Sequence, residues 1–191
     1  MRAFAGESQA RNRYTFAAEI AKKQGLYVIE AVFKYTANQE LAHANVFMKH
    51  LSELNGESVE IDGSYPVEVT NSVIELLENA VHNETEEYED VYQSFANKAK
   101  EEGIMDVAHS FEMIAKIENE HAKRFDMFAE LLKQNKLFVS DVKCDWVCLN
   151  CGNVINVQQV PEICPVCSHE RGYFVRLEFA PYTAKCSNNS K

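Results

Sequence analysis

Glu40-Leu41-Ala42-His43 and Glu118-Asn119-Glu120-His121 are two copies of the pattern Glu-x-x-His, one in each half of the helical part of the chain. On an α-helix, residues three apart share a face, so each copy directs one carboxylate and one imidazole to the same side. A single copy is common on solvated helix faces. Two copies in matching surroundings predict the two halves of one metal site.

The residues around the two motifs also match. Seven positions recur at the same spacing, pairing Gly25, Phe33, Ala37, Glu40, His43, Ala44 and Phe47 with Gly103, Phe111, Ala115, Glu118, His121, Ala122 and Phe125. Each glycine ends a segment with helical apolar spacing, so each half is predicted to be helix–glycine–helix. Two copies are too few for a solenoid, and the duplication favours a closed bundle.

Four helices are expected. They run over about 3–24, 26–54, from Thr70 or Asn71 to 103, and 104–134, with a crossing connection over 57–69. The short joints make each pair antiparallel, and the long central link carries the second pair across the first. From Lys143 onward the helical period gives way to glycine, proline, cysteine and β-forming residues. The predicted fold class is mainly α, a ferritin-like four-helix bundle with one long crossover followed by a small β-rich module.

Composition excludes several classes of function. The formal charge of −10 argues against nucleic acid as the partner, because phosphate binding needs a basic surface. No apolar run approaches the length of a membrane span, and Met1-Arg2-Ala3-Phe4 lacks the layout of a signal peptide. Six cysteines without such a leader are expected to be metal ligands rather than disulfides, and all lie beyond position 143.

A dinuclear site also needs carboxylates from the other two helices. Glu7 and Glu84 stand upstream of the two motifs across the same glycine joints, and Glu87 lies one turn from Glu84. The candidate ligands are Glu7, Glu40, His43, Glu84, Glu87, Glu118 and His121. Carboxylate oxygens with some imidazole suit iron or manganese, in the arrangement known from di-iron carboxylate bundles. The alternative is that these residues are solvated, and it applies most to Glu87, which lies in an acidic run.

Two tyrosines fall about two turns after the upstream glutamates. Tyr14 lies seven residues after Glu7, and Tyr92 lies eight residues after Glu84. Their hydroxyls could donate hydrogen bonds to ligand carboxylates and orient the metal site. Simple packing in the core is the alternative.

The cysteines form a separate constellation. Cys148 and Cys151 make one Cys-x-x-Cys knuckle, and Cys164 and Cys167 make the other. Four thiolates at this spacing predict a tetrahedral single-metal site, which either zinc or iron would accept. Trp146, Tyr173 and Phe174 are expected to shield it, Cys144 and Cys186 are interpreted as ordinary thiols, and His169 as a surface residue.

The segment from Phe4 to Tyr14, the paired Glu-x-x-His motifs and the terminal knuckles together closely resemble the rubrerythrin family. The resemblance covers nearly the whole chain. It implies a ferritin-like di-iron domain over 1–140 and a rubredoxin-like iron–tetracysteine domain over 141–191, with two iron ions and one iron ion respectively. It also implies a cytoplasmic homodimer or larger homo-oligomer.

The resemblance further implies an activity. The expected enzyme is a non-haem peroxidase of the NADH peroxidase type that reduces hydrogen peroxide in oxidative-stress defence. Its electrons would come from NAD(P)H through a reductase or rubredoxin and then the tetracysteine centre.

Each candidate residue falls on a family position. The seven glutamates and histidines match the di-iron ligands, Tyr14 and Tyr92 match the neighbouring tyrosines, and Cys148, Cys151, Cys164 and Cys167 match the rubredoxin-like ligands. One departure is Ser168, where a free-standing rubredoxin has glycine.

A different class of function remains open. A ferritin-like ferroxidase or iron-storage protein would use the same bundle, with a structural zinc in the cysteine module. Zinc on the four thiolates, or a large hollow oligomer, would favour it. An oxygenase acting on an organic substrate lacks a recognisable pocket signal in the sequence.

Overall fold

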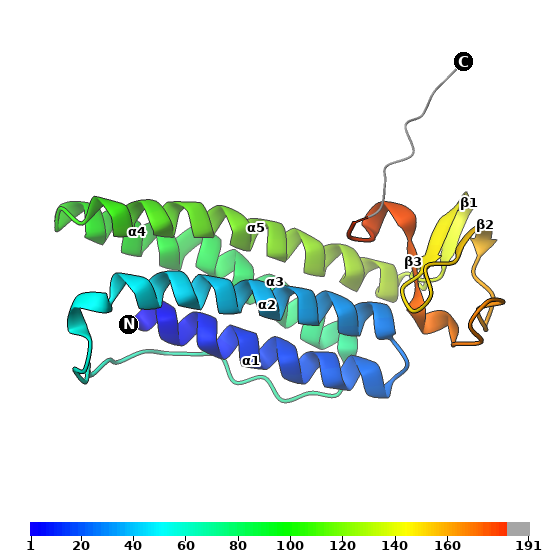
Figure 1. The fold of residues 1–191 in the computed structure, drawn as a ribbon, viewed down its shortest axis with the longest axis horizontal. Helices are drawn as coiled ribbons and strands as arrows, with labels where there is room; N and C mark the ends of the chain where they lie inside the picture. The colour runs from blue at the N-terminus through cyan, green and yellow to red at the C-terminus, as the bar shows by residue number, and fades with distance from the viewer. Residues whose placement is uncertain (183–191) are drawn as a thin grey trace, which may run out of the picture.

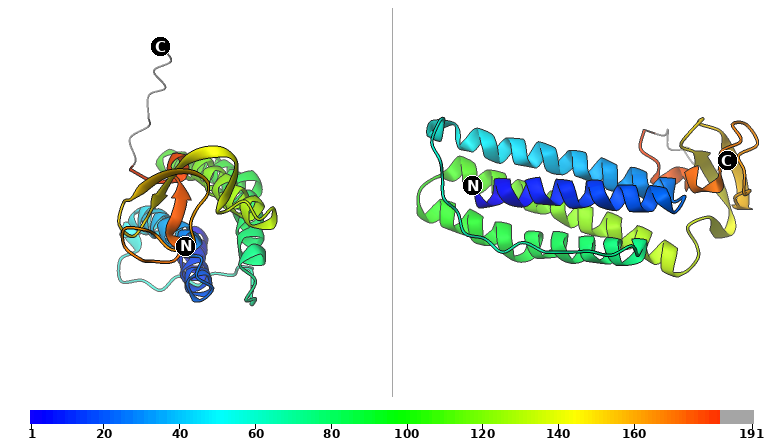
Figure 2. Two further views of the ribbon diagram at one scale, coloured as in Figure 1. Left: turned by 90° about the vertical axis from the view of Figure 1, so that its right-hand side faces the viewer. Right: turned by 90° about the horizontal axis from the view of Figure 1, so that it is seen from below.

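The computed structural model describes residues 1–182 and confirms the predicted fold class (Figure 1). Helix α1 (Arg2–Lys23) and helix α2 (Tyr27–His50) form the first antiparallel pair. The second pair consists of α3 (Val73–Glu86) continued by α4 (Tyr92–Glu101), and of α5 (Met105–Lys133). A small sheet follows at one end of the bundle, as all three views show (Figure 2).

The two glycine joints have the same conformation. Gly25 has a φ of 71° and Gly103 a φ of 77°, in the left-handed region where glycine carries no steric penalty. Leu26 N–H donates to the carbonyl of Ala21 at 3.0 Å, and Ile104 N–H to that of Ala99 at 2.8 Å. These bonds satisfy carbonyls at the helix ends and turn the chain back on itself.

The long connection runs along the outside of the bundle from the end of α2 to the start of α3 (Figure 2). Helix α2 ends at His50 and a 3₁₀ turn, η1 (Ser52–Leu54), follows it, so α2 is shorter than expected. The N-cap of α3 is Ser72, whose side chain accepts from Glu75 N–H. The predicted caps were Thr70 and Asn71. Thr70 instead accepts from Ser72 N–H and so supports the cap from outside the helix.

The third predicted helix is not continuous. A five-residue π-helical segment, η2 (Glu87–Val91), interrupts it between α3 and α4. A π turn accommodates one more residue than an α turn, and such segments are frequent at functional sites. The segment begins at Glu87, the candidate ligand that has no counterpart in the first half.

The C-terminal module contains three antiparallel strands in the order β2-β1-β3. They are β1 (Val139–Cys148), β2 (Val154–Gln159) and β3 (Phe174–Arg176), with 3₁₀ turns η3 (Arg171–Tyr173) and η4 (Leu177–Phe179) on either side of β3. Trp146 and Phe174 are fully buried with Cys148 and Cys164, as expected.

The module packs against the α1–α2 turn. The rings of Tyr27 and Tyr173 stack with centroids 4.0 Å apart. At Gly172, a β-carbon would lie only 1.8 Å from the carbonyl oxygen of Gly25, so this contact requires glycine. Val147 and Val175 of the module join the core of the bundle.

None of the helices within residues 1–182 is both long and apolar enough to cross a membrane.

Candidate metal centres

The bundle brings the candidate ligands together at its centre. Glu7 comes from α1, Glu40 and His43 from α2, Glu84 from α3, and Glu118 and His121 from α5. All six side chains are buried. Glu87, at the start of η2, is mostly buried.

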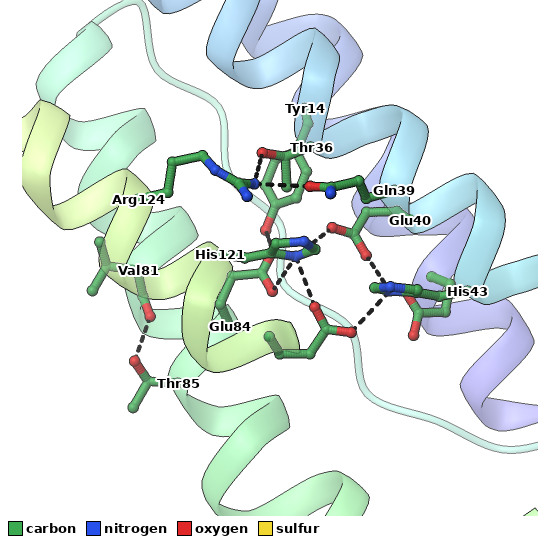
Figure 3. A network of polar contacts seen from close by, with 12 residues as sticks. Tyr14, Thr36, Gln39, Glu40, His43, Val81, Glu84, Thr85, His121 and Arg124 are labelled. Carbon is green, nitrogen blue, oxygen red and sulfur yellow. Dashed lines mark hydrogen bonds and ion pairs between the residues drawn. The ribbon is translucent and has the colours of Figure 1, made fainter. Parts of the chain in front are cut away.

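Glu40 lies between the two histidines (Figure 3), and Glu118 also approaches both imidazoles. Glu40 places Oε2 3.2 Å from Nδ1 of His43 and Oε1 2.9 Å from Nδ1 of His121. Glu118 places its two oxygens 2.9 Å and 2.8 Å from the same two nitrogens. Each of these carboxylates therefore faces both imidazoles, as a bridging ligand would.

Glu7 and Glu84 each belong to one side only. Oε2 of Glu7 lies 3.6 Å from His43 Nδ1, and Oε2 of Glu84 lies 3.4 Å from His121 Nδ1. Two groups of potential ligand atoms result, each with all its atoms within 4.8 Å of one another. They are Glu7, Glu40, His43 and Glu118 in one group, and Glu40, Glu84, Glu118 and His121 in the other.

The donor set fits two cations. Buried oxygens of Glu7, Glu40, Glu84 and Glu118, and both ring nitrogens of His121, have no well-formed hydrogen bond. Buried polar atoms without partners are costly, and buried charges are normally paired or bound to metal. Four buried carboxylates around two imidazoles would gain such partners from two iron ions.

The groups of the cluster shift the pKa values of Glu84 and Glu40 in opposite directions. Burial raises the pKa of Glu84 to about 8, and the charge of Glu40 adds to this. Burial also opposes ionisation of Glu40, but the close approach of the His121 and His43 imidazoles outweighs it and holds the pKa of Glu40 at about 2. The cluster therefore combines a carboxyl group of raised pKa, Glu84, with one of lowered pKa, Glu40.

The two tyrosines bind carboxylates of the opposite repeat. Tyr14 of α1 donates to Oε1 of Glu84, and Tyr92 of α4 donates to Oε1 of Glu7. Burial and the nearby glutamate charge raise the pKa of each tyrosine, so the hydroxyls keep their protons and donate. The sequence did not indicate which carboxylate each tyrosine would meet.

Glu87 belongs to neither group of ligand atoms among the described residues. Burial raises the pKa of its carboxyl group, and the charges of Glu84 and Glu7 add to this. Its side chain lines a surface pocket together with Tyr92. Glu87 therefore stands beside the cluster, between it and solvent.

A polar group that was not predicted lies on the His121 side (Figure 3). Arg124 donates to Thr36 at 3.0 Å and to Gln39 at 2.9 Å, and so ties α5 to α2. The available signal was a break in the duplication, since Val46 is the matching residue of the first half.

The four knuckle cysteines converge in the C-terminal module. Sγ of Cys148 lies 3.8 Å from that of Cys167, and Sγ of Cys151 lies 3.8 Å from that of Cys164. All four sulfur atoms lie within 4.8 Å of one another, as a single metal ion requires. Cys144 is outside this set, and Cys186 lies outside the described residues. His169 is exposed.

Main-chain amides shape this site. Burial raises the pKa of Cys148 to about 12, whereas the amide of His169 is the main reason that the pKa of Cys167 is lowered to about 6. The second knuckle turns at Ser168, whose φ is 58°, and the first turns at Gly152, whose φ is 77°. Serine thus occupies a left-handed position that favours glycine.

The fold and the two clusters define a class of protein: a ferritin-like carboxylate bundle with an appended tetracysteine module. The family model described as rubrerythrin matches residues 1–129, and the model described as rubrerythrin, rubredoxin-like domain, matches residues 146–175. The chain belongs to the rubrerythrin family.

Individual relatives agree with this assignment. Rubrerythrin-1 of Clostridium acetobutylicum is 44% identical over 91% of this chain and 90% of its own length. Rubrerythrin of Porphyromonas gingivalis is 43% identical over 90% of this chain and 84% of its own. The solved structure described as the fully reduced, all-ferrous state of nigerythrin superposes with a TM-score of 0.61 at 27% identity, covering 91% of this chain and 82% of that one.

The predicted cofactors follow from the family and the donor sets. The glutamate–histidine groups fit the di-iron site of the rubrerythrin family, and the four cysteines fit its rubredoxin-like iron site. The family is one of oxidoreductases linked to oxidative stress.

Proposed function

We propose that this protein is a non-haem di-iron peroxidase that reduces hydrogen peroxide to water. The observation that carries the proposal is the position of Glu40 and Glu118, each of which faces both histidines with its two oxygens. Such carboxylates would hold two metal ions, which together could supply the two electrons that reduction of one O–O bond consumes. The proposed di-iron ligands are Glu7, Glu40, His43, Glu84, Glu87, Glu118 and His121.

The reaction consumes one hydrogen peroxide, two protons and two electrons, and yields two water molecules. When bound, the two ferrous ions would act as Lewis acids and supply the electron pair. Tyr14 and Tyr92 would hold Glu84 and Glu7 in position through their donated hydrogen bonds. Glu87, which lies outside both groups of ligand atoms, and one of the two histidines are proposed to change their contacts with oxidation state.

The electrons are proposed to arrive singly through Cys148, Cys151, Cys164 and Cys167, which would hold the third iron ion. Their source would be NAD(P)H, through a separate reductase or rubredoxin. We further propose a homodimer or larger homo-oligomer with domains over 1–140 and 141–191. The cysteines, gathered as ligands rather than as disulfides, favour the cytoplasm.

The decisive experiment compares two oxidants. The iron-loaded protein is reduced without oxygen, and its reoxidation is followed by stopped-flow absorbance with hydrogen peroxide or with dioxygen. We expect hydrogen peroxide to react faster. A faster reaction with dioxygen would refute the peroxidase and favour the ferroxidase, as would zinc on the four thiolates.

A variant separates the two centres. Cys164→Ser removes one thiolate of the C-terminal site and leaves the bundle unchanged. The di-iron site of this variant, reduced chemically, should still react once with hydrogen peroxide. Steady turnover with NADH and a reductase should be lost. Full steady turnover in the variant would refute the proposed electron route.

A further inference from the structure

A pocket of 620 Å³ opens beside the candidate di-iron site, between the bundle and the crossover connection. Glu87 and Tyr92 line it from the bundle, and Asp62 to Pro66 line it from the connection. Tyr92 in turn donates to Glu7. The pocket thus adjoins Glu87 and the hydrogen-bond partner of the buried Glu7.

A second pocket, of 650 Å³, lies between the bundle and the C-terminal module. Its lining includes Tyr35 and Leu149, but none of the seven candidate ligands and neither Tyr14 nor Tyr92. The two cavities are similar in volume, but they differ in whether their lining includes candidate ligands or the tyrosines that contact them. The first adjoins the site and the second does not.

Tyr65 lines the first pocket from the side of the crossover connection. Every residue from Glu57 to Val67 is exposed except Tyr65, which is half-buried. Its hydroxyl donates to the carbonyl of Arg2 at 3.2 Å. A β-carbon at Gly6 would lie 3.9 Å from the edge of its ring, so the ring faces the helix position next to Glu7.

Few contacts hold this part of the connection. Arg2 donates Nε–H to the carbonyl of Asp62 at 3.0 Å and pairs with the Asp62 carboxylate. Both charged groups of that pair are largely exposed to solvent, where an ion pair contributes little. Tyr65 lines the pocket from this sparsely held connection, and its replacement changes no helix residue.

We propose that this pocket is the entrance by which peroxide reaches the site, and that Tyr65 limits the size of the peroxide admitted. The inference rests on the proposed function. The lining is mostly apolar, and its polar side chains, among them Arg13, Asn83 and Asp90, offer hydrogen bonds to a small molecule such as hydrogen peroxide. The ring of Tyr65 above Gly6 leaves less room for an alkyl hydroperoxide.

The test measures selectivity. Wild type and Tyr65→Ala are loaded with iron, reduced, and mixed with hydrogen peroxide or tert-butyl hydroperoxide. The ratio of the second rate constant to the first should rise about tenfold in the variant, the order of discrimination that a pocket achieves on a small apolar group. Tyr35→Ala removes a tyrosine from the second pocket and should leave the ratio unchanged.

A second measurement does not depend on turnover. Azide binding to the reduced, iron-loaded protein is followed by stopped-flow absorbance. Gly6→Leu places a side chain beneath the Tyr65 ring and should slow azide association about tenfold, on the same scale of steric discrimination. Gly6→Ala, whose added carbon meets Tyr65 at an ordinary contact distance, should bind azide much as wild type does. Iron content and circular dichroism establish that each variant is folded and loaded.

Three results would overturn the proposal. They are an unchanged peroxide ratio in Tyr65→Ala, an equal rise in Tyr35→Ala, and unaltered azide association in Gly6→Leu. Failure of the wild type to prefer hydrogen peroxide to dioxygen would refute the proposed peroxidase instead, and azide association would still decide whether the pocket is the entrance.

Discussion

Tyr14 of helix α1 donates its hydroxyl hydrogen to Glu84 of helix α3, so a side chain of the first repeat fixes a carboxylate of the second. Tyr92 and Glu7 make the reciprocal contact. The two hairpins are thereby joined at the centre of the bundle by two buried hydrogen bonds. Neither half has a complete set of contacts by itself.

Replacing Tyr14 by phenylalanine should weaken metal binding at the Glu84 side. Loss of a hydrogen bond that orients a ligand typically lowers metal affinity by about 10- to 100-fold. Competition with a chelator measures the affinity. Tyr35→Phe, an exposed tyrosine of the same bundle, is the control, and equal affinities in the two variants would contradict the prediction.

Glu118 should matter to both metal ions, and Glu7 to one. Glu118 faces both histidines, whereas Glu7 approaches only His43. We expect Glu118→Gln to lose both iron ions of the bundle and Glu7→Gln to lose one, as measured by iron analysis. Glu120→Gln changes an exposed neighbour paired with Lys123 and should retain both. Retention of one ion in Glu118→Gln would show that it does not bridge.

The π segment can be tested by deleting one residue. Removing Glu89 should convert η2 to α-helix and leave Tyr92 in place, because the wider turn only absorbs the one additional residue. Tyr92 should still donate to Glu7, and the iron affinity should change little. Glu89→Ala keeps the chain length and should also behave as wild type. Circular dichroism checks that the helices persist, and a large loss of iron affinity in the deletion variant would contradict this account.

Ser168→Gly should stabilise the cysteine module by about 1 kcal/mol, because serine carries a steric penalty at positive φ that glycine avoids. Gly152→Ala makes the opposite change at the matching position and should destabilise it. Loss of the iron–thiolate absorption band in guanidinium chloride measures both. Shifts of the same sign would rule out this account.

Gly172→Ala should separate the module from the bundle. The new β-carbon would lie 1.8 Å from the carbonyl oxygen of Gly25, and relieving the clash should cost about 2 kcal/mol or more. Calorimetry should show an earlier transition for the module than in wild type. Gly6→Ala, where the added carbon has room, serves as the comparison. A single unshifted transition in Gly172→Ala would contradict the contact.

The duplication made the bundle predictable, because matched glycines, aromatics and Glu-x-x-His motifs recur at one spacing. The same logic pointed to Glu7 and Glu84. The crossed tyrosine contacts were not accessible, since they depend on how the hairpins pack rather than on spacing along one helix. Ser72 caps α3, and not Thr70 or Asn71. The sequence could not select among the three, because each residue type is a favoured N-cap and the backbone geometry decides which one is used.

The π segment was present in the sequence as an unexplained difference. Tyr14 follows Glu7 by seven residues and Tyr92 follows Glu84 by eight. The difference in spacing has two possible explanations: Tyr92 could lie on another face of the helix, or a wider turn could absorb the additional residue. The structure shows the wider turn, which absorbs the additional residue and leaves both tyrosines in equivalent positions.

That single additional residue has a consequence for the ancestry of the site. A faithful duplication would give two interchangeable coordination environments, and neither ion would have a distinct task. The insertion preserves the reciprocal tyrosine contacts, while Glu87, opposite Ala10, and Arg124, opposite Val46, distinguish the second copy from the first. The two halves can therefore differ at their margins while the inner contacts of the duplicated architecture stay matched.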